Sequence, residues 1–259
     1  MTVKLHYTRS GSGPPVVLLH GLFGSANNLG ALARALQGNY CVYCVDLPNH
    51  GRSDWLDNTS LITMMDSIEH WQRSQQLTEA AFVGHSLGGK VAMQLALAHP
   101  QCVSALVVAD IAPVDYPPHH DQVFAALEAV ASDSCRSRHS AAELMATHIE
   151  EEQVIQFLLS SLRRDKDGVY RWRFNLEELY GAYAELRASP VATSPYTGPV
   201  LFIKGGASDY IREEHRARVV SLFPRADVKI MPGCGHWFHA ERPQLFNSLV
   251  MRFLDKQMA

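Results

Sequence analysis

The sequence has little that would place the chain on a membrane or on a nucleic acid. No apolar run is long enough to span a bilayer, and the opening Met1-Thr-Val-Lys-Leu-His-Tyr7 lacks the apolar stretch of a secretion signal. The formal net charge is -3, and no basic stripe is visible. A glycine loop of the P-loop or dinucleotide-binding type is missing as well. We therefore expect no membrane partner, no nucleic-acid partner and no cofactor.

Cysteine is scarce, and its number is odd. The chain has five cysteines and no secretion signal, which predicts reduced thiols in a cytoplasm. Cys41-Val-Tyr-Cys44 has the spacing of a redox motif, but it lies in a run typical of a strand. Side chains three residues apart on a strand point to opposite faces. We interpret these two cysteines as packing residues.

Residues that can build a core are plentiful. The chain has 259 residues, of which 47% are hydrophobic and 19% charged, as in an ordinary globular protein. Apolar strand-like runs alternate with helix-like segments, which predicts an α/β fold with a mostly parallel sheet flanked by helices. We expect strands at 3–7 (an edge strand), 15–20, 40–46, 80–83, 103–109, 199–204 and 227–231. Helices are expected at 27–36, 63–76, 89–99, 213–222 and 243–255.

This alternation stops after the fifth strand. Between residues 113 and 196 the pattern is helix-like with no convincing strand, and prolines bracket the segment. Val154, Phe157, Leu158 and Leu162 form one of four apolar stripes in it. We interpret 113–196 as a helical cap inserted into a core made of 1–112 and 197–259. The alternative is that these helices only thicken the core.

The rest of the chain is organised around Gly84-His85-Ser86-Leu87-Gly88, which lies between a strand-like run and a helix-like run. This is the context of a nucleophile elbow, a tight turn that exposes a serine hydroxyl. The two glycines suit such a turn because it has no room for Cβ atoms beside the serine. Ser86 is therefore the candidate nucleophile.

A serine nucleophile needs an adjacent base, which a third group orients. His236 is the candidate base because it lies in the loop after the last strand. His239 is the competitor, although it already begins the terminal helix, and His85 has the sequence position of a packing residue.

Negative charge on the attacked oxygen calls for preorganised N–H donors. We assign one donor to the backbone of Leu87 and the other to Leu22, in the loop after the strand that ends at His20. Phe23 should form a pocket wall.

Two further histidine-containing stretches receive structural interpretations. His119-His120-Asp121 looks like a metal cluster, but adjacent residues at a helix start rarely converge on one ion, so we expect no metal site. His50, in a turn after a strand, is expected to bond to the backbone.

Several motifs together resemble the α/β-hydrolase superfamily along the whole chain. They are His20-Gly-Leu-Phe-Gly24, Asp46-Leu-Pro-Asn-His-Gly-Arg-Ser53, Gly84-His-Ser-Leu-Gly-Gly89 and Gly235-His-Trp237. A second set is similar to the small YbfF-type carboxylesterases: Asn49, Asp110-Ile-Ala-Pro-Val-Asp-Tyr116, Val154-Ile-Gln-Phe-Leu-Leu159, Trp172-Arg-Phe-Asn175 and Gly205-Gly-Ala-Ser208. The resemblance implies serine-dependent hydrolysis of carboxylic esters, with acyl thioesters of coenzyme A among the substrates.

The acid that orients the histidine has two candidates, Asp110 and Asp209. Both keep the chain order serine, aspartate, histidine. Most α/β-hydrolases place the acid after the later strand, which favours Asp209. The YbfF-type resemblance favours Asp110, with Ser208 joining the acid to the histidine. Asp110 also directly ends an apolar strand, whereas Asp209 lies in a turn where aspartate is common.

The function that we expect is a carboxylesterase acting on a small-molecule ester or acyl thioester. The alternatives are another reaction on the same scaffold, such as C–C bond hydrolysis or perhydrolysis, and an inactive binding module. The cap should cover the acyl chain. The candidate substrate-binding residues are Phe23, Phe124, Phe157, Leu158, Trp172 and Trp237. The sequence predicts no oligomeric state.

Overall fold

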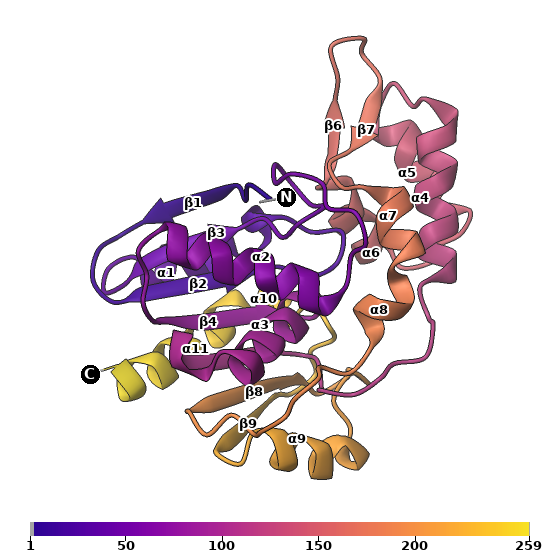
Figure 1. The fold of residues 1–259 in the computed structure, drawn as a ribbon. Helices are drawn as coiled ribbons and strands as arrows, with labels where there is room; N and C mark the ends of the chain where they lie inside the picture. The colour runs from indigo at the N-terminus through magenta and orange to yellow at the C-terminus, as the bar shows by residue number, and fades with distance from the viewer. Residues whose placement is uncertain (1–2, 259) are drawn as a thin grey trace.

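A seven-stranded mixed sheet runs through the protein in the computed structural model, which describes residues 3–258. Its strand order is β1-β3-β2-β4-β5-β8-β9, and β1 pairs antiparallel with β3 while the other pairs are parallel (Figure 1). The strands are β1 (Tyr7–Ser10), β2 (Pro15–Leu19), β3 (Cys41–Val45), β4 (Ala80–His85), β5 (Val103–Ala109), β8 (Val200–Gly205) and β9 (Ala226–Met231). The predicted fold class is confirmed.

The first strand is shifted from its predicted place. It begins at Tyr7, not at residue 3, and pairs Tyr7 with Val45 through Ser10 with Val42. The preceding residues bond instead to the loop after β3, because Asp46 N donates to His6 O and Asp54 N donates to Lys4 O. Residues 1–2 and 259, which the predicted core includes, lie outside the described residues.

Helices cover both faces of the sheet (Figure 1). Those of the sheet-forming part are α1 (Gly30–Leu36), α2 (Leu61–Ser74), α3 (Leu87–Ala98), α9 (Arg216–Leu222), α10 (Phe238–Glu241) and α11 (Pro243–Met258). Short 3-10 turns precede or follow three of them: η1 (Ala26–Leu29), η2 (Pro100–Cys102) and η3 (Glu213–His215). The predicted helices are present, with ends that differ by a few residues.

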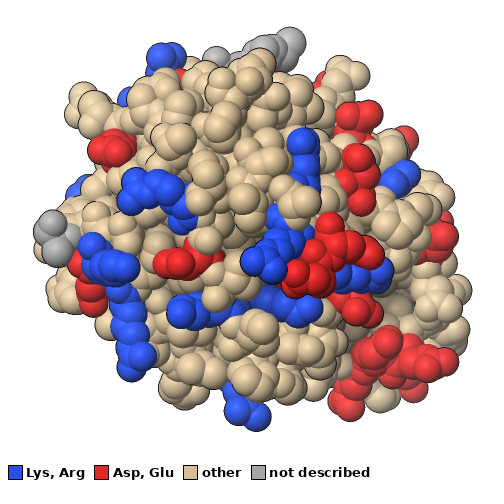
Figure 2. Space-filling view, turned by 90° about the horizontal axis from the view of Figure 1, so that it is seen from below, with Lys and Arg blue, Asp and Glu red and all other residues tan. Residues whose placement is uncertain are grey.

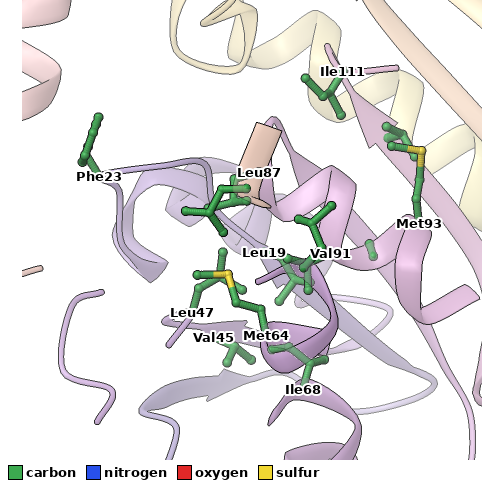
Figure 3. Close-up of a cluster of buried hydrophobic side chains, with 14 of the residues drawn as sticks. Leu19, Phe23, Val45, Leu47, Met64, Ile68, Leu87, Val91, Met93 and Ile111 are labelled. Atoms are coloured by element: carbon green, nitrogen blue, oxygen red, sulfur yellow. The ribbon is translucent and has the colours of Figure 1, made fainter. Parts of the chain in front are cut away.

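Alternate strand residues enter two separate cores. Val17 and Leu19 pack with residues of α2 and α3, whereas Val16 and Leu18 pack with residues of α1 and α11. Figure 3 shows part of the first core, where Leu19 lies among Val91 of α3 and Met64 of α2. Burying each such side chain stabilises the fold by about 1.5–3 kcal/mol.

Cys41 and Cys44 follow the same alternation. Both are free and buried, and they belong to different cores. Their predicted packing role is confirmed, and the geometry of the strand keeps their thiols apart.

The segment between β5 and β8 leaves the sheet and lies to one side of it (Figure 1). Its helices are α4 (Asp121–Asp133), α5 (Arg138–Ala146), α6 (Glu152–Leu159), α7 (Leu176–Gly181) and α8 (Tyr183–Arg187). We call residues 113–196 the cap segment.

The expectation of no strand in the cap segment is wrong. β6 (Leu162–Arg164) and β7 (Tyr170–Trp172) form an antiparallel hairpin. Gly168 turns the chain with a φ of 84°, and Arg171 pairs with Asp165 and Asp167 across the hairpin. The Asp-Gly dipeptide at its turn is a recognised hairpin signal.

Several buried contacts fasten the cap segment to the sheet-forming part. Lys90 on α3 donates to the carbonyl oxygens of Val114, Arg187 and Ala188, at both connections of the cap segment. Ser161 Oγ donates to Phe23 O at 2.6 Å. Since these bonds join residues far apart in sequence, the cap segment is positioned over the loops that follow β2 and β4.

The surface of the molecule carries charges of both signs. On the face seen from below, Lys and Arg side chains are interspersed with Asp and Glu side chains (Figure 2). This face has no large patch of one sign, in keeping with the small net charge.

Candidate active site

Ser86 occupies a strained turn between β4 and α3. Its backbone has φ 52° and ψ -117°, a conformation that non-glycine residues rarely adopt. A Cβ on Gly84 would lie 2.2 Å from Gly88 O, and a Cβ on Gly88 would lie 2.3 Å from Leu19 O. Both positions therefore need glycine, which is the steric reason for the motif.

Asp110 lies at the carboxyl end of β5, next to the strand that carries Ser86. Its side chain is completely buried, and its oxygens accept bonds from three groups. Gly205 N donates to Oδ1 at 2.8 Å, Ser208 Oγ donates to Oδ2, and His236 Nδ1 lies 2.8 Å from Oδ2. Both oxygens of the carboxyl group therefore have hydrogen-bond partners.

The structure separates the two candidate acids. Asp209 has a side chain that is 91% exposed and lies 4.0 Å from Arg212, whereas Asp110 bonds to His236. Asp209 is therefore a surface residue of the turn after β8.

His236 lies in the loop after β9 and is held from several sides. Its ring stacks on Tyr210, with centroids 4.1 Å apart and planes inclined by 25°. Because Nδ1 bonds to Asp110, Nε2 is the nitrogen left for chemistry. His236 and Ser86 line the same cavity, although no hydrogen bond joins them among the described residues.

His85 supports this loop. Its Nε2 lies 2.9 Å from the carbonyl oxygen of His236, and its ring is 4.7 Å from the His236 ring. Burial lowers the pKa of His85, so the neutral ring donates to the carbonyl. His85 therefore packs as predicted and also forms a specific hydrogen bond to the loop that carries His236.

His239 is buried and packs against neighbouring aromatic rings. It lies in α10, a short helix that precedes α11, and not at the start of the terminal helix as predicted. Its ring packs 4.3 Å from that of His85, and burial lowers its pKa to about 4. Asp110 bonds to His236, not to His239.

Two backbone N–H groups lie beside Ser86. Leu22 and Leu87 both line a small cavity with Ser86, and among residues 3–258 neither N–H has a hydrogen-bond acceptor. Phe23 N, by contrast, donates to His50 Nε2 at 3.1 Å.

His50 fixes the loop that carries Leu22. Its Nδ1 lies 2.9 Å from Pro48 O, and burial lowers its pKa to about 3, so it stays neutral and can accept from Phe23 N. The predicted bonding of His50 to the backbone is confirmed. Phe23 has a φ of 62°, in the left-handed region that residues other than glycine seldom adopt.

Two cavities meet at Ser86. The main cavity, of about 330 Å³, lies under the cap segment, and its wall includes Phe23, Phe157, Leu158, His236 and Trp237. A smaller cavity, of about 40 Å³, has Leu22, Leu87, Lys90, Ile111, Leu186 and Arg187 in its wall.

Two predicted pocket residues do not line either cavity. Phe124 is buried against Phe23, with ring centroids 5.4 Å apart, and Trp172 stacks on Phe174 at 5.2 Å. Phe124 is buried and Trp172 is half-buried, and both pack against the hydrophobic core.

Sequence reasoning missed several residues of the cavity walls. His119, His120 and Tyr210 line both cavities. His119 Nε2 lies 2.7 Å from Tyr210 Oη, and His120 Nδ1 lies 2.6 Å from Tyr183 Oη. Their sequence signal was the paired histidines at the start of the cap segment, which was interpreted only as an improbable metal site.

Residues 3–258 contain no group of three or more His, Cys, Asp or Glu side chains arranged to hold a metal ion. Over the same residues, no helix combines the length and the apolar character needed to cross a membrane.

Comparison with known proteins gives consistent results. Residues 16–249 match the model of the alpha/beta hydrolase family. Esterase YbfF of Escherichia coli (strain K12) is 40% identical over 93% of this chain and 93% of its own length. The sn-1-specific diacylglycerol lipase ABHD11 of Mus musculus is 36% identical over 93% of this chain and 81% of its own length.

Among solved structures, a marine microorganism esterase superimposes with a TM-score of 0.94 at 34% identity, covering 97% of this chain and 100% of that one. The family model and both sequence relatives extend over nearly the whole chain. The chain therefore belongs to the alpha/beta hydrolase family, among the relatives of the YbfF-type esterases.

Proposed function

We propose that this carboxylesterase hydrolyses its ester through an acyl-enzyme on Ser86. The observation that carries the proposal is the 2.8 Å bond between Asp110 and His236, made at the edge of the cavity that Ser86 lines. A buried carboxylate, a histidine and a half-buried serine that lines the cavity form the arrangement that activates serine. Leu22 and Leu87 supply N–H donors for the oxyanion.

In the first step His236 Nε2 takes the proton of Ser86 Oγ, and Oγ bonds to the carbonyl carbon of the ester. The carbonyl oxygen becomes an oxyanion, which accepts bonds from the N–H groups of Leu22 and Leu87. His236 then gives its proton to the leaving alkoxide as the C–O bond breaks. The products are a free alcohol and an acyl ester on Ser86.

Water completes the cycle in the same geometry. His236 takes a proton from water, the hydroxide bonds to the acyl carbon, and the second oxyanion uses the same two donors. When the intermediate collapses, Ser86 Oγ leaves and recovers its proton from His236. Asp110 orients His236 and stabilises its charged form, while Ser208 and Gly205 N hold Asp110 in place.

The same sequence of steps would cleave a thioester, since sulfur can replace the leaving oxygen.

All five cysteines are free thiols. This supports the cytoplasmic location predicted from the cysteine usage.

A fluorophosphonate probe tests the proposal directly. We expect stoichiometric labelling of Ser86, located by mass spectrometry, and hydrolysis of short p-nitrophenyl esters. Ser86→Ala should neither label nor hydrolyse these esters above the residual rate due to binding and the oxyanion donors. Absence of labelling in the folded wild-type protein would favour an inactive binding module. Labelling without ester hydrolysis would favour another reaction of the fold.

A further inference from the structure

The sheet ends in a strand whose outer side is open. β9 lies at the opposite end of the sheet from β1, and among residues 3–258 it pairs with β8 alone (Figure 1). Asp227, Val228, Lys229 and Ile230 are all exposed, whereas every residue of β3 and β4 is buried. Val228 is 51% exposed and Ile230 is 59% exposed. Both faces of β9 are therefore accessible along this stretch, as well as its outer edge.

Backbone hydrogen bonds show which residues of β9 point outward. Gly206 N donates to Met231 O at 2.9 Å, so the backbone groups of Met231 face β8. Because the N–H and C=O groups of successive strand residues point to alternate sides, those of Lys229 also face β8. The backbone groups of Val228 and Ile230 therefore point away from the sheet. Free N–H and C=O groups on an edge strand form a template for pairing with another chain.

The outward groups of β9 match those of a second copy of the strand. An antiparallel pair forms its hydrogen bonds between residues that both point their backbone groups at the partner strand. With Val228 opposite Val228 of the second copy, these residues exchange both of their N–H···O bonds. Ile230 N then donates to Ala226 O of the second copy, and the twofold axis repeats that bond. Ala226 N is already used, since it donates to Phe223 O at 3.0 Å.

This alignment also places opposite charges against each other. Asp227 lies opposite Lys229 of the second copy, where facing Cβ atoms of paired strands are about 4.5–5.5 Å apart. Within residues 3–258 no ion pair involves either side chain. On the other face of the strand, Val228 meets its own copy and Ile230 meets Ala226. β9 is therefore complementary to itself in both charge and polarity.

Other alignments of the same two strands are unfavourable. A shift by two residues in one direction sets the Lys229 side chains against each other, and the opposite shift does the same for Asp227. Like charges directly opposite each other destabilise a strand pair. A shift by one residue sets outward backbone groups against inward ones, which removes the hydrogen bonds between the strands. A single alignment thus satisfies both the backbone and the charges.

We propose that this protein forms a twofold-symmetric dimer in which β9 pairs antiparallel with β9 of a second copy. The two seven-stranded sheets then form one continuous sheet. A second copy is the partner because β9 matches itself in hydrogen bonding, charge and polarity. A strand pair of this length is small beside a standard interface of about 800 Å² per partner, so we expect a weak dimer that depends on protein concentration.

Analytical ultracentrifugation from about 10 µM to about 1 mM protein measures the dimer. We expect the wild-type protein to pass from monomer to dimer over this range. Asp227→Lys and Lys229→Asp each set like charges against each other, so each alone should raise the dimer Kd at least about tenfold. Neither side chain lines the cavities at Ser86, so unchanged ester hydrolysis shows that the variants are folded.

Charge exchange gives the most specific comparison. A mixture of the Asp227→Lys and Lys229→Asp variants should form a mixed dimer, because each chain then faces opposite charges from the other. The double variant should self-associate within about threefold of the wild-type Kd. The matched control is a mixture of Asp57→Lys and Lys166→Asp, at exposed positions outside β9, which should dimerise as the wild-type protein does.

Val228→Pro tests the backbone bonds. It removes the N–H at the centre of the proposed pair, an outward group that the bonds to β8 do not use. We expect loss of the dimer with ester hydrolysis retained. If this variant fails to fold, the charge variants still decide.

Three results would overturn the proposal. A wild-type protein that stays monomeric up to about 1 mM would show that the charges of β9 protect a free edge. A dimer that survives both single charge substitutions would use another surface. Single variants that do not associate when they are mixed would exclude the pairing of Asp227 with Lys229.

Discussion

Tyr210 and His236 stack face to face, with ring centroids 4.1 Å apart and planes inclined by 25°. Tyr210 follows β8, whereas His236 follows β9, so the contact joins two loops at the carboxyl edge of the sheet. Tyr116 Oη donates to the carbonyl oxygen of Tyr210, and the Tyr210 hydroxyl bonds to His119 of the cap segment. The ring that carries the proposed base is therefore held between Asp110 at its Nδ1 and Tyr210 on its face.

Replacing Tyr210 should test this support. We expect Tyr210→Leu to lower kcat for a short p-nitrophenyl ester about tenfold, because a well-placed aromatic pair contributes roughly 0.5–1.5 kcal/mol. Tyr210→Phe keeps the ring and should restore most of the rate. Equal loss in both variants would assign the effect to the hydroxyl and its bond to His119.

The two aspartates provide a direct comparison. Asp110→Asn should lower kcat by roughly 10³–10⁴, because it removes the carboxylate that orients the histidine. Asp209→Asn should have little effect on kcat, since its side chain is 91% exposed and faces Arg212. Steady-state kinetics of both variants, with circular dichroism to check the fold, decide between them. A loss of kcat of that size in Asp209→Asn would contradict the assignment of Asp110.

Stability should fall in mild acid because His239 is buried in its neutral form. Its folded pKa of about 4 lies below the unfolded value near 6.5, so the unfolded chain binds the proton first and stability is lost as pH falls between these values. For this group alone the loss between pH 7 and pH 5 is about 2 kcal/mol.

Urea unfolding at the two pH values measures this loss. His239→Phe should reduce the difference in unfolding free energy between pH 7 and pH 5 by about the same amount. Replacing the exposed His139 with glutamine should not change it. A pH dependence that His239→Phe leaves intact would have to arise from other groups, and His239 would not be the source.

Lys90 should control how firmly the cap segment is held. Lys90→Met removes the donor shared by Val114, Arg187 and Ala188, and each buried carbonyl left without a partner costs about 1–3 kcal/mol. We expect faster hydrogen exchange in α4–α8 and faster proteolysis at the two connections. Lys229→Met, on the exposed part of β9, is the matched control. Unchanged exchange in the Lys90 variant would show that other contacts suffice to hold the cap segment.

The sequence by itself determined the α/β fold and the position of the elbow. The β-type apolar runs identify the central strands because a strand buried on both faces has no polar alternation. Ser86 could be located because its turn requires glycine at Gly84 and Gly88 for steric reasons that any such turn shares. The position of His236 at the same edge as Ser86 could be predicted from the order of strands and loops, since the carboxyl ends of parallel strands meet at one edge.

Only the tertiary structure distinguishes Asp110 from Asp209, because both keep the same chain order and they differ in burial and in the bond that Asp110 alone makes to His236. It likewise placed Phe124 and Trp172 in packing contacts away from the cavity walls, and it placed His119, His120 and Tyr210 at the cavities. The 3.6-residue period of a helix shows which residues share a face, but it does not show which part of the protein that face contacts. That depends on how the cap segment docks, through contacts such as those of Lys90 with chain segments some 24–98 residues away.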